Sequence, residues 1–183
     1  MWADKDMLEI LVTGEQIRER AIELGAEITR DYKAEGKKPL LVALLKGSVP
    51  WLVDISRNID LDTAVDFMDV SSYEGTESTG DIRIEKDLTT SIKGVDILLV
   101  EDIVDTGKTI KEVVKTFYFR GANSVKIVTL LDKPSGRIND VKADYVGFTI
   151  KGGFVVGYGL DFNQHYRSLP YVGILKPECY ETK

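Results

Sequence analysis

Residues 100–109 read VEDIVDTGKT, and they join a predicted strand to a predicted helix. The apolar run Val95 to Val100 predicts a strand that is buried on both faces of a sheet and runs directly into Glu101 and Asp102. Downstream, Lys108 to Arg120 carries apolar side chains at helical spacing, and a glycine follows that can end the helix. A strand, a short loop and a helix in this order are typical of one unit of a parallel α/β sheet.

The rest of the chain continues this alternation of strands and helices. Thr13 to Gln16 matches a capping box and predicts a helix that ends before Gly36 and Pro39. Ser48 is expected to cap a second helix, Val49 to Arg57. The remaining predicted elements are strands at Leu40–Leu45, Thr63–Val70, Ile82–Glu85, Val125–Leu131 and Tyr145–Thr149, and a polar loop at Ser71–Asp81. We therefore predict an α/β fold with a doubly wound, mainly parallel sheet flanked by helices.

Length and composition bound the class of protein. The 183 residues suit one domain, and a net charge of −6 with a pI near 4.9 disfavours a nucleic-acid binder, which needs clustered Lys and Arg. The single cysteine, Cys179, cannot form an internal disulfide. The polar N-terminus and the short apolar runs predict neither a signal peptide nor a membrane span. We expect a cytoplasmic protein without a membrane partner.

The loop within residues 100–109 has the features of a phosphate site beside a sugar. A helix N-terminus presents unpaired N–H groups to an anion, and Gly107 allows a close backbone approach. Thr106 and Thr109 add hydroxyl donors. The carboxylates of Glu101 and Asp102 can accept hydrogen bonds from vicinal hydroxyls or help to hold a metal ion. This combination indicates a phosphorylated sugar with free hydroxyls.

Two other interpretations of the loop carry less weight. A Walker A loop needs a glycine five residues before Gly107, and Asp102 occupies that position, which excludes the kinase and NTPase interpretation. An ordinary acidic strand-to-helix turn would not need so many of these residues in order.

The same ten residues resemble the 5-phosphoribosyl 1-pyrophosphate motif of type I phosphoribosyltransferases. Four further segments resemble the hypoxanthine–guanine phosphoribosyltransferase family, and the similarity runs from about residue 10 to 178. These segments are Leu45-Lys46-Gly47, Ser71-Ser72-Tyr73, Leu130 to Pro134, and Phe154 to Asp161 with Arg167. Two departures are Lys151-Gly152-Gly153, where relatives more often have a proline and an acid, and Gly159, where some have alanine; we expect the second to matter little.

The resemblance implies a fold and a domain plan. It implies the type I phosphoribosyltransferase fold as a single domain over residues 1–183, with a core at about 38–150. A small hood lobe is implied for the terminal segments, at about 1–37 and 151–183.

The resemblance also implies a reaction. It implies a purine salvage transferase that uses Mg²⁺ and moves the 5-phosphoribosyl group from 5-phosphoribosyl 1-pyrophosphate to N9 of hypoxanthine or guanine. The products are IMP or GMP and pyrophosphate. The transition state is expected to be oxocarbenium-like, so catalysis needs proton transfer at the base, a metal on pyrophosphate and exclusion of water. A homodimer or homotetramer is implied as well.

Roles follow for the residues of the loop. Asp105 is the implied catalytic base near purine N7, although a helix-capping role is the alternative and the two can coexist. Glu101 and Asp102 are implied to bind the ribose hydroxyls. Lys108 is equally well a phosphate donor or a solvated lysine. The implied ligands of the ribose and the 5′-phosphate are Glu101, Asp102, Asp105, Thr106, Gly107, Lys108 and Thr109.

Other segments supply the base, the pyrophosphate and the lid. Lys133 is implied to donate to O6 of the purine, so an adenine amino group would be rejected. The implied purine ligands are Lys133, Phe154, Val155 and Asp161; the pyrophosphate ligands Lys46, Gly47 and Arg167; the lid residues Ser72 and Tyr73; and the Mg²⁺ ligands Asp161, Glu101 and Asp102.

Rival functions remain. A regulator with the same fold could sense the sugar phosphate and bind nucleic acid, but the −6 charge counts against it. A nucleotide-binding module without turnover would not need Asp105, Tyr73 or Asp161. Within enzymes, a xanthine- or adenine-preferring relative is the closer rival. The sequence does not rank hypoxanthine, guanine and xanthine.

Overall fold

The computed structural model describes residues 1–72 and 82–181. A six-stranded sheet with the order β4-β3-β2-β5-β6-β7 forms its centre. Four neighbouring pairs are parallel, and only β4 runs antiparallel to its neighbour at one edge of this sheet. The strands are β2 Leu40–Leu44, β3 Val65–Ser72, β4 Ile82–Lys86, β5 Asp96–Val104, β6 Ser124–Asp132 and β7 Tyr145–Thr149. The predicted doubly wound, mainly parallel sheet is confirmed.

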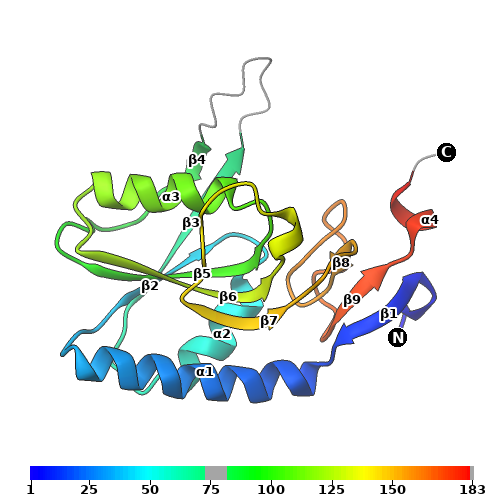
Figure 1. Cartoon of the computed structure of the whole chain (residues 1–183), viewed down its shortest axis with the longest axis horizontal. Coiled ribbons are helices and arrows are strands. Elements are labelled where there is room, and N and C mark those ends of the chain that lie inside the picture. Colours follow the sequence, from blue (N-terminus) through cyan, green and yellow to red (C-terminus); the bar gives the residue numbers. More distant parts are fainter. Residues whose placement is uncertain (73–81, 182–183) are drawn as a thin grey trace.

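Helices cover both faces of the sheet. The helices α1 (Gly14–Ala34) and α2 (Val49–Asn58) lie on one face, and α3 (Lys108–Phe119) lies on the other (Figure 1). The capping box of α1 is present, since Thr13 Oγ1 accepts a hydrogen bond from Gln16 N while Gln16 Oε1 accepts one from Thr13 N. In the described part of the chain, no helix is both long and apolar enough to cross a bilayer.

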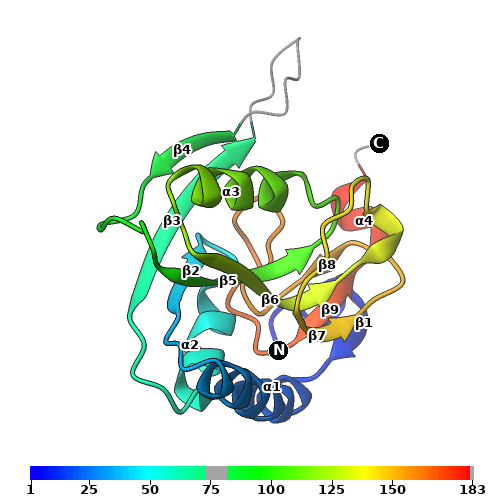
Figure 2. The same ribbon diagram turned by 60° about the vertical axis from the view of Figure 1, so that its left-hand side comes forward.

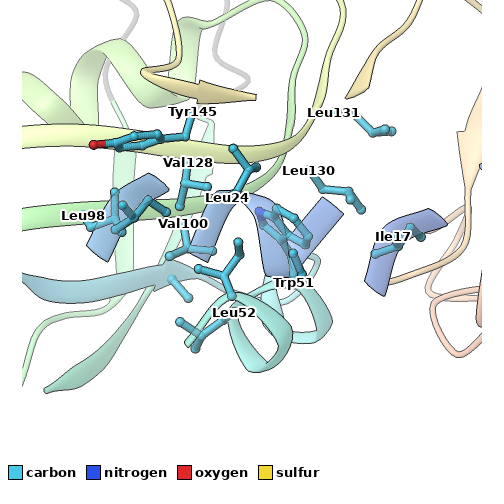
Figure 3. Close-up of a cluster of buried hydrophobic side chains, with 14 of the residues drawn as sticks. Ile17, Leu24, Trp51, Leu52, Leu98, Val100, Val128, Leu130, Leu131 and Tyr145 are labelled. Carbon is cyan, nitrogen blue, oxygen red and sulfur yellow. The ribbon is translucent and has the colours of Figure 1, made fainter. Parts of the chain in front are cut away.

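The larger core lies between the sheet and the pair α1 and α2. Figure 3 shows Trp51 and Leu52 from α2 close to Leu24 from α1, with Val100 and Val128 beside them in the same cluster. Burying one such side chain stabilises the fold by roughly 1.5–3 kcal/mol. A second cluster packs α3 on the opposite face of the sheet. Because both faces are covered, β2 and the stretch Ile97–Val100 of β5 are continuous apolar runs, as the sequence predicts.

A small antiparallel sheet joins the two ends of the chain. Its strands have the order β1-β9-β8 and span Met7–Val12, Val172–Leu175 and Val155–Val156. Short helices accompany it at Asp4–Asp6 (η1) and Pro177–Tyr180 (α4), and another, Pro134–Gly136 (η2), follows β6. Both views show this sheet beside one end of the central sheet (Figures 1 and 2).

The packing divides the N-terminal segment differently from the expected boundary near residue 38. Only the residues up to the end of β1 join the small sheet. The helix α1 buries Ile17, Leu24 and Ile28 in the core of the central sheet. An amphipathic helix of this length lies where it can bury its apolar face, and the central sheet offers the larger apolar surface.

Three local predictions need correction. The strand β5 does not end at Val100 but continues to Val104, because β6 runs on to Asp132 and keeps supplying main-chain partners. Likewise β3 extends to Ser72, into the predicted loop, because it pairs with β4. Ser48 occupies the N-cap position of α2, but its hydroxyl donates to the carbonyl of Leu44 instead of capping the helix.

Candidate functional site

A cavity of about 160 Å³ lies at the N-terminus of α3. Gly107 occupies the N-cap position with φ 77°, a left-handed conformation that suits glycine. The first turn of α3 therefore presents its N–H groups at this cavity, which fits a phosphate. Because the N-cap is Gly107, the alternative role of Asp105 as a helix cap does not apply. The cavity is lined by Glu101, Ile103, Asp105, Thr106, Gly107, Lys108, Thr109 and Ile110.

Asp105 and Lys133 form an ion pair. Lys133 Nζ lies 3.1 Å from Asp105 Oδ2, although the two residues come from the ends of different strands. The side chains are 21% and 39% exposed for Lys133 and Asp105 respectively, so both remain accessible to a ligand. The structure thus brings together the predicted base and the predicted purine-recognition lysine.

A second cavity of about 260 Å³ adjoins the first through Glu101 and Thr109. It lies between the end of β2, the acidic end of β5 and the segment after β8. A Cβ at residue 47 would lie 1.6 Å from Asp102 Oδ2, so only glycine fits there. The Leu45–Lys46 peptide beside it is cis. Predicted residues for the pyrophosphate, the ribose and the metal line this one cavity: Lys46, Gly47, Glu101, Asp102, Asp161 and Arg167.

The two acids of β5 are poorly solvated. Burial raises the pKa of Glu101 well above its usual range, and the neighbouring Asp102 adds to the effect. Burial also raises the pKa of Asp102 to about 6, against the opposing hydrogen bond from Ile103 N and the charge of Arg167. Glu101 Oε2 is shielded from solvent and has no hydrogen-bond partner within residues 1–72 and 82–181. Such a pair is stabilised by a ligand that brings hydroxyl donors or a cation.

Arg167 closes the second cavity from the C-terminal side. Its Nη2 lies 2.8 Å from Asp161 Oδ1, and its Nη1 donates to the carbonyl of Gly159 at 2.7 Å. Asp161 Oδ2 also accepts from Gln164 N at 2.8 Å. Arg167 Nε is buried and has no partner in the described part of the chain. The guanidinium therefore keeps donor capacity for an anion.

The donor set suits a hard divalent cation that arrives with its ligand. Glu101, Asp102 and Asp161 offer carboxylate oxygens, which Mg²⁺ prefers. Among the described residues, however, no group of three or more His, Cys, Asp or Glu side chains is arranged to hold a metal ion. Mg²⁺ commonly takes one or two carboxylates and completes its shell with water and phosphate oxygens, and this arrangement agrees with that habit.

Phe154, one of the predicted purine ligands, belongs to a cluster of aromatic side chains. Phe154 is 37% exposed, stacks on Tyr180 at 4.8 Å between ring centroids, and meets Phe162 edge-on at 5.5 Å. Since Tyr180 covers one face of the Phe154 ring, a purine can stack only on the other face unless Tyr180 moves. Val155 begins β8, an edge strand of the small sheet, so its main chain has one side outside the ladder.

The lid prediction falls mostly outside the described residues. Ser72 ends β3, and Tyr73 is not among the residues that the structure describes.

The structure adds residues that the sequence did not single out. Arg137 and Gly136, in the loop after β6, contact the main chain and the carboxylate of Asp105. A Cβ at residue 136 would lie 1.7 Å from Asp105 Oδ1. The only signal in the sequence is a glycine and an arginine shortly after Lys133, which by itself indicates an ordinary surface loop.

Comparison with known proteins agrees with this geometry. Residues 8–163 match the family model described as a phosphoribosyl transferase domain. The chain is 53% identical over 178 residues to a hypoxanthine-guanine phosphoribosyltransferase of Lactococcus lactis, covering 97% of this chain and 96% of that relative. It is 51% identical to the protein of the same name in Bacillus subtilis, with 97% and 98% covered. A crystal structure of a hypoxanthine phosphoribosyltransferase from Staphylococcus aureus superposes with a TM-score of 0.94 at 49% identity, covering 100% of this chain and 98% of the other.

Proposed function

The chain belongs to the phosphoribosyltransferase family, among the hypoxanthine–guanine phosphoribosyltransferases, and from this we propose that it is a purine salvage enzyme. It transfers the 5-phosphoribosyl group of 5-phosphoribosyl 1-pyrophosphate to N9 of hypoxanthine or guanine and releases pyrophosphate. The observation that carries the proposal is the convergence of two cavities. A phosphate cradle beside Asp105 adjoins, through Glu101, a cavity lined by three carboxylates and two cationic side chains.

The sugar phosphate fits across both cavities. The 5′-phosphate accepts from the main-chain N–H groups of Asp105 to Thr109 and from the hydroxyls of Thr106 and Thr109. The ribose hydroxyls donate to Glu101 and Asp102, whose shielded carboxylates need donors. The pyrophosphate accepts from Lys46, the main chain at Gly47 and Arg167, which line the second cavity. In this arrangement each phosphate group meets hydrogen-bond donors, and the ribose meets the carboxylates of Glu101 and Asp102.

Mg²⁺ belongs with the pyrophosphate in this proposal. Asp161, Glu101 and Asp102 would supply the carboxylate oxygens that hold the ion. A bound Mg²⁺ would supply positive charge for the leaving pyrophosphate. Arg167, which already pairs with Asp161, orients that carboxylate and contributes its remaining donors to the leaving group.

In this proposal Lys133, which pairs with Asp105 in the structure, donates to the purine base when the base binds. Lys133 donates to O6 of hypoxanthine or guanine, and Asp105 accepts the purine proton near N7. Phe154 stacks on the purine, while the main chain of Val155 pairs with the base edge. Adenine has an amino group at position 6, so Lys133 would face another donor. A site built on such a hydrogen bond can reject the wrong base by ~10⁴-fold.

The lid, the cellular compartment and the oligomeric state complete the proposal. We also propose that Ser72 and Tyr73 have the lid role, the exclusion of water during transfer. The enzyme works in the cytoplasm as a homodimer or homotetramer, and α2, whose Val53 is exposed among buried neighbours, is a candidate contact.

The experiment that tests the function is a base-by-base assay. The purified protein, Mg²⁺ and 5-phosphoribosyl 1-pyrophosphate are incubated separately with hypoxanthine, guanine, xanthine and adenine, and nucleotide formation is followed by absorbance. We expect conversion of hypoxanthine or guanine and little conversion of adenine. Asp105→Asn should lower kcat by ~10²- to 10⁴-fold, because the proton acceptor is lost.

Asp60→Asn is the matched control. Asp60 also pairs with a lysine, at 2.6 Å from Lys33 Nζ, but it is 89% exposed and lies outside both cavities. The control variant should be as active as the wild type. Tight binding of the sugar phosphate without turnover on any base would overturn the enzyme proposal in favour of a regulator.

A further inference from the structure

Arg137 lies behind the loop that carries Asp105. Its side chain is only 13% exposed. Nε donates to the carbonyl of Asp105 at 2.9 Å, and Nη2 donates to the carbonyl of Val104 at 2.9 Å. The same guanidinium pairs with Asp132 and donates to the carbonyl of Val141. One side chain therefore joins the end of β5 to the end of β6 and to the loop that follows it.

Main-chain contacts from the same segment continue this attachment. We call residues 133–141 the bracing segment. Its Lys133 N donates to the carbonyl of Val104 at 3.0 Å, and its Ile138 N donates to the carbonyl of Thr106 at 3.2 Å. Together with Arg137, the bracing segment thus binds three successive carbonyls, those of residues 104, 105 and 106.

The direction of these carbonyls determines the direction of the neighbouring N–H groups. In a planar trans peptide the C=O and the following N–H point in opposite directions. Three carbonyls turned toward the bracing segment therefore turn the N–H groups of Asp105, Thr106 and Gly107 away from it. The 160 Å³ cavity is lined by these same residues. A run of N–H groups that point into one concavity binds an anion.

We propose that Arg137 is a positioning residue for the proposed reaction. It holds the loop so that its N–H groups face the 5′-phosphate and the Asp105 carboxylate stays at the base. The identity of the ligand rests on the proposed function. The attachment itself rests on the contacts of the guanidinium, which only arginine can make, since lysine carries a single ammonium in place of a planar fork.

Arg20 provides a matched control elsewhere in the fold. Its Nε donates to the carbonyl of Gly147 at 3.2 Å, its Nη2 donates to the carbonyl of Val146 at 2.9 Å, and its Nη1 pairs with Glu23 at 2.7 Å. The chemistry repeats that of Arg137, with two successive carbonyls and one carboxylate. Those carbonyls belong to β7, outside both cavities.

The test compares Arg137→Lys with Arg20→Lys in the full chain. We measure kcat, KM for 5-phosphoribosyl 1-pyrophosphate, the melting temperature, and amide hydrogen exchange of residues 104–109. We expect Arg137→Lys to lower kcat/KM by ~10²-fold, the effect of a displacement of about 1 Å at a reacting centre, and to speed exchange in this loop. Arg20→Lys should change the melting temperature by a similar amount and leave both readouts near wild type.

A second variant covers the case in which Arg137→Lys does not fold. Gly136→Ala places a methyl group against the Asp105 carboxylate, so it should lower kcat while KM for the sugar phosphate changes less. Gly36→Ala is its control, since among the described residues no atom lies within 4 Å of a Cβ added there.

Equal effects of the two arginine variants on activity and on loop exchange would overturn the inference. If the wild type makes no nucleotide, the proposed function fails, and hydrogen exchange alone decides the role of Arg137. Faster exchange of residues 104–109 in Arg137→Lys, with no change in Arg20→Lys, would then still support it.

Discussion

Glu101, Asp102 and Gly47 illustrate how single residues prepare the site. Asp102 lies so close to Gly47 that any side chain at position 47 would displace the carboxylate. Burial disfavours the charged form of both acids, and Glu101 Oε2 has no partner in the described chain. These costs persist in the folded protein because packing elsewhere outweighs them, and a ligand with hydroxyl donors or a cation relieves them. The two buried acids therefore suit a ligand with vicinal hydroxyls, such as the proposed sugar phosphate.

Lys133→Gln should separate base recognition from the rest of the reaction. A charged hydrogen bond contributes about 1.5–3 kcal/mol, so losing it should lower kcat/KM for hypoxanthine by ~10- to 150-fold. Glutamine can accept as well as donate, so adenine should lose less, and the ratio between the two bases should narrow. Steady-state kinetics with both bases measures this ratio.

Lys115→Gln is the control for that variant, since Lys115 is 76% exposed on α3 and, among the described residues, pairs only with Glu112 at 3.3 Å. An unchanged ratio of hypoxanthine to adenine in Lys133→Gln would show that Lys133 does not read position 6.

Asp66 fixes the start of β3 to the segment after β4. Its Oδ2 accepts from the N–H and the hydroxyl of Thr89 at 2.7 and 2.9 Å, and its Oδ1 accepts from Phe67 N at 2.7 Å. The side chain is 8% exposed. Burial alone would raise the pKa of Asp66, but these hydrogen bonds and the charge of Lys86 outweigh it and hold the pKa below its usual range. The carboxylate therefore stabilises the junction at the edge of the sheet.

The stability of the protein should depend on pH through Asp66. Because its pKa is lower in the folded state, its contribution is complete above the unfolded value of about 3.9 and is lost as the pH falls through the folded value. Asp66→Asn should cost about 1–3 kcal/mol at pH 7, since a charged acceptor is removed. Below about pH 4 the difference from wild type should shrink. Urea unfolding at pH 7, 5 and 3 measures both effects, and a constant difference would contradict this account.

The loop after β8 touches the loop after β2 through Gly159. Gly159 has φ 103°, and a Cβ there would lie 1.8 Å from the carbonyl oxygen of Gly47. Our expectation that alanine at this position matters little is therefore wrong for this structure. Arg167 holds the glycine on both sides, since its Nη1 bonds to the Gly159 carbonyl and its own carbonyl accepts from Gly159 N at 2.9 Å.

Gly159→Ala should displace the pyrophosphate loop. We expect KM for 5-phosphoribosyl 1-pyrophosphate to rise by ~10-fold or more, together with a lower melting temperature. Gly36→Ala is the control: its φ of 65° also strains alanine, but no atom lies within 4 Å of the added group and the residue follows α1, far along the chain from the site loops. It should lower the melting temperature and leave KM unchanged. Equal KM values in the two variants would contradict the role of Gly159.

At the scale of the whole molecule, the features that the sequence predicts correctly are those that depend on residues close together in the chain. The capping box at Thr13, the apolar run of β2 and the helical spacing of α3 each depend on a short window, and each was confirmed. The pairing of Met7 with Leu175 and the contact of Arg137 with Asp105 depend on residues far apart in the chain. No local period encodes them. The family resemblance implied a lobe built from the two terminal segments, but its strand pairing and the contacts of the bracing segment came from the structure.

The proposed ligand should stabilise the fold because it contacts residues of the central sheet and also residues of the segment that joins two strands of the small sheet. Glu101 and Asp102 come from the central sheet, whereas Asp161 and Arg167 come from the segment between β8 and β9. A ligand at 100 times its Kd contributes about 2.7 kcal/mol, which corresponds to a rise of about 5–10 °C in Tm for a chain of this size. Pyrophosphate with Mg²⁺ should produce this rise. Mg²⁺ alone should not, because the described carboxylates form no cluster that holds the ion unaided.

The control for this prediction removes either the cation or one carboxylate at a time. EDTA should remove most of the rise in Tm that pyrophosphate gives and leave only the smaller effect of the anion on Arg167, because without the cation the anion meets Glu101, Asp102 and Asp161 unscreened. The Asp161→Asn protein should lose most of the Mg²⁺-dependent rise in Tm. It should retain the smaller rise that comes from binding of pyrophosphate to Arg167. Thermal unfolding of both proteins, with each ligand alone and together, separates these contributions. An undiminished rise in EDTA would mean that the anion is bound by the cations of the cavity alone, and that the acids serve only the ribose.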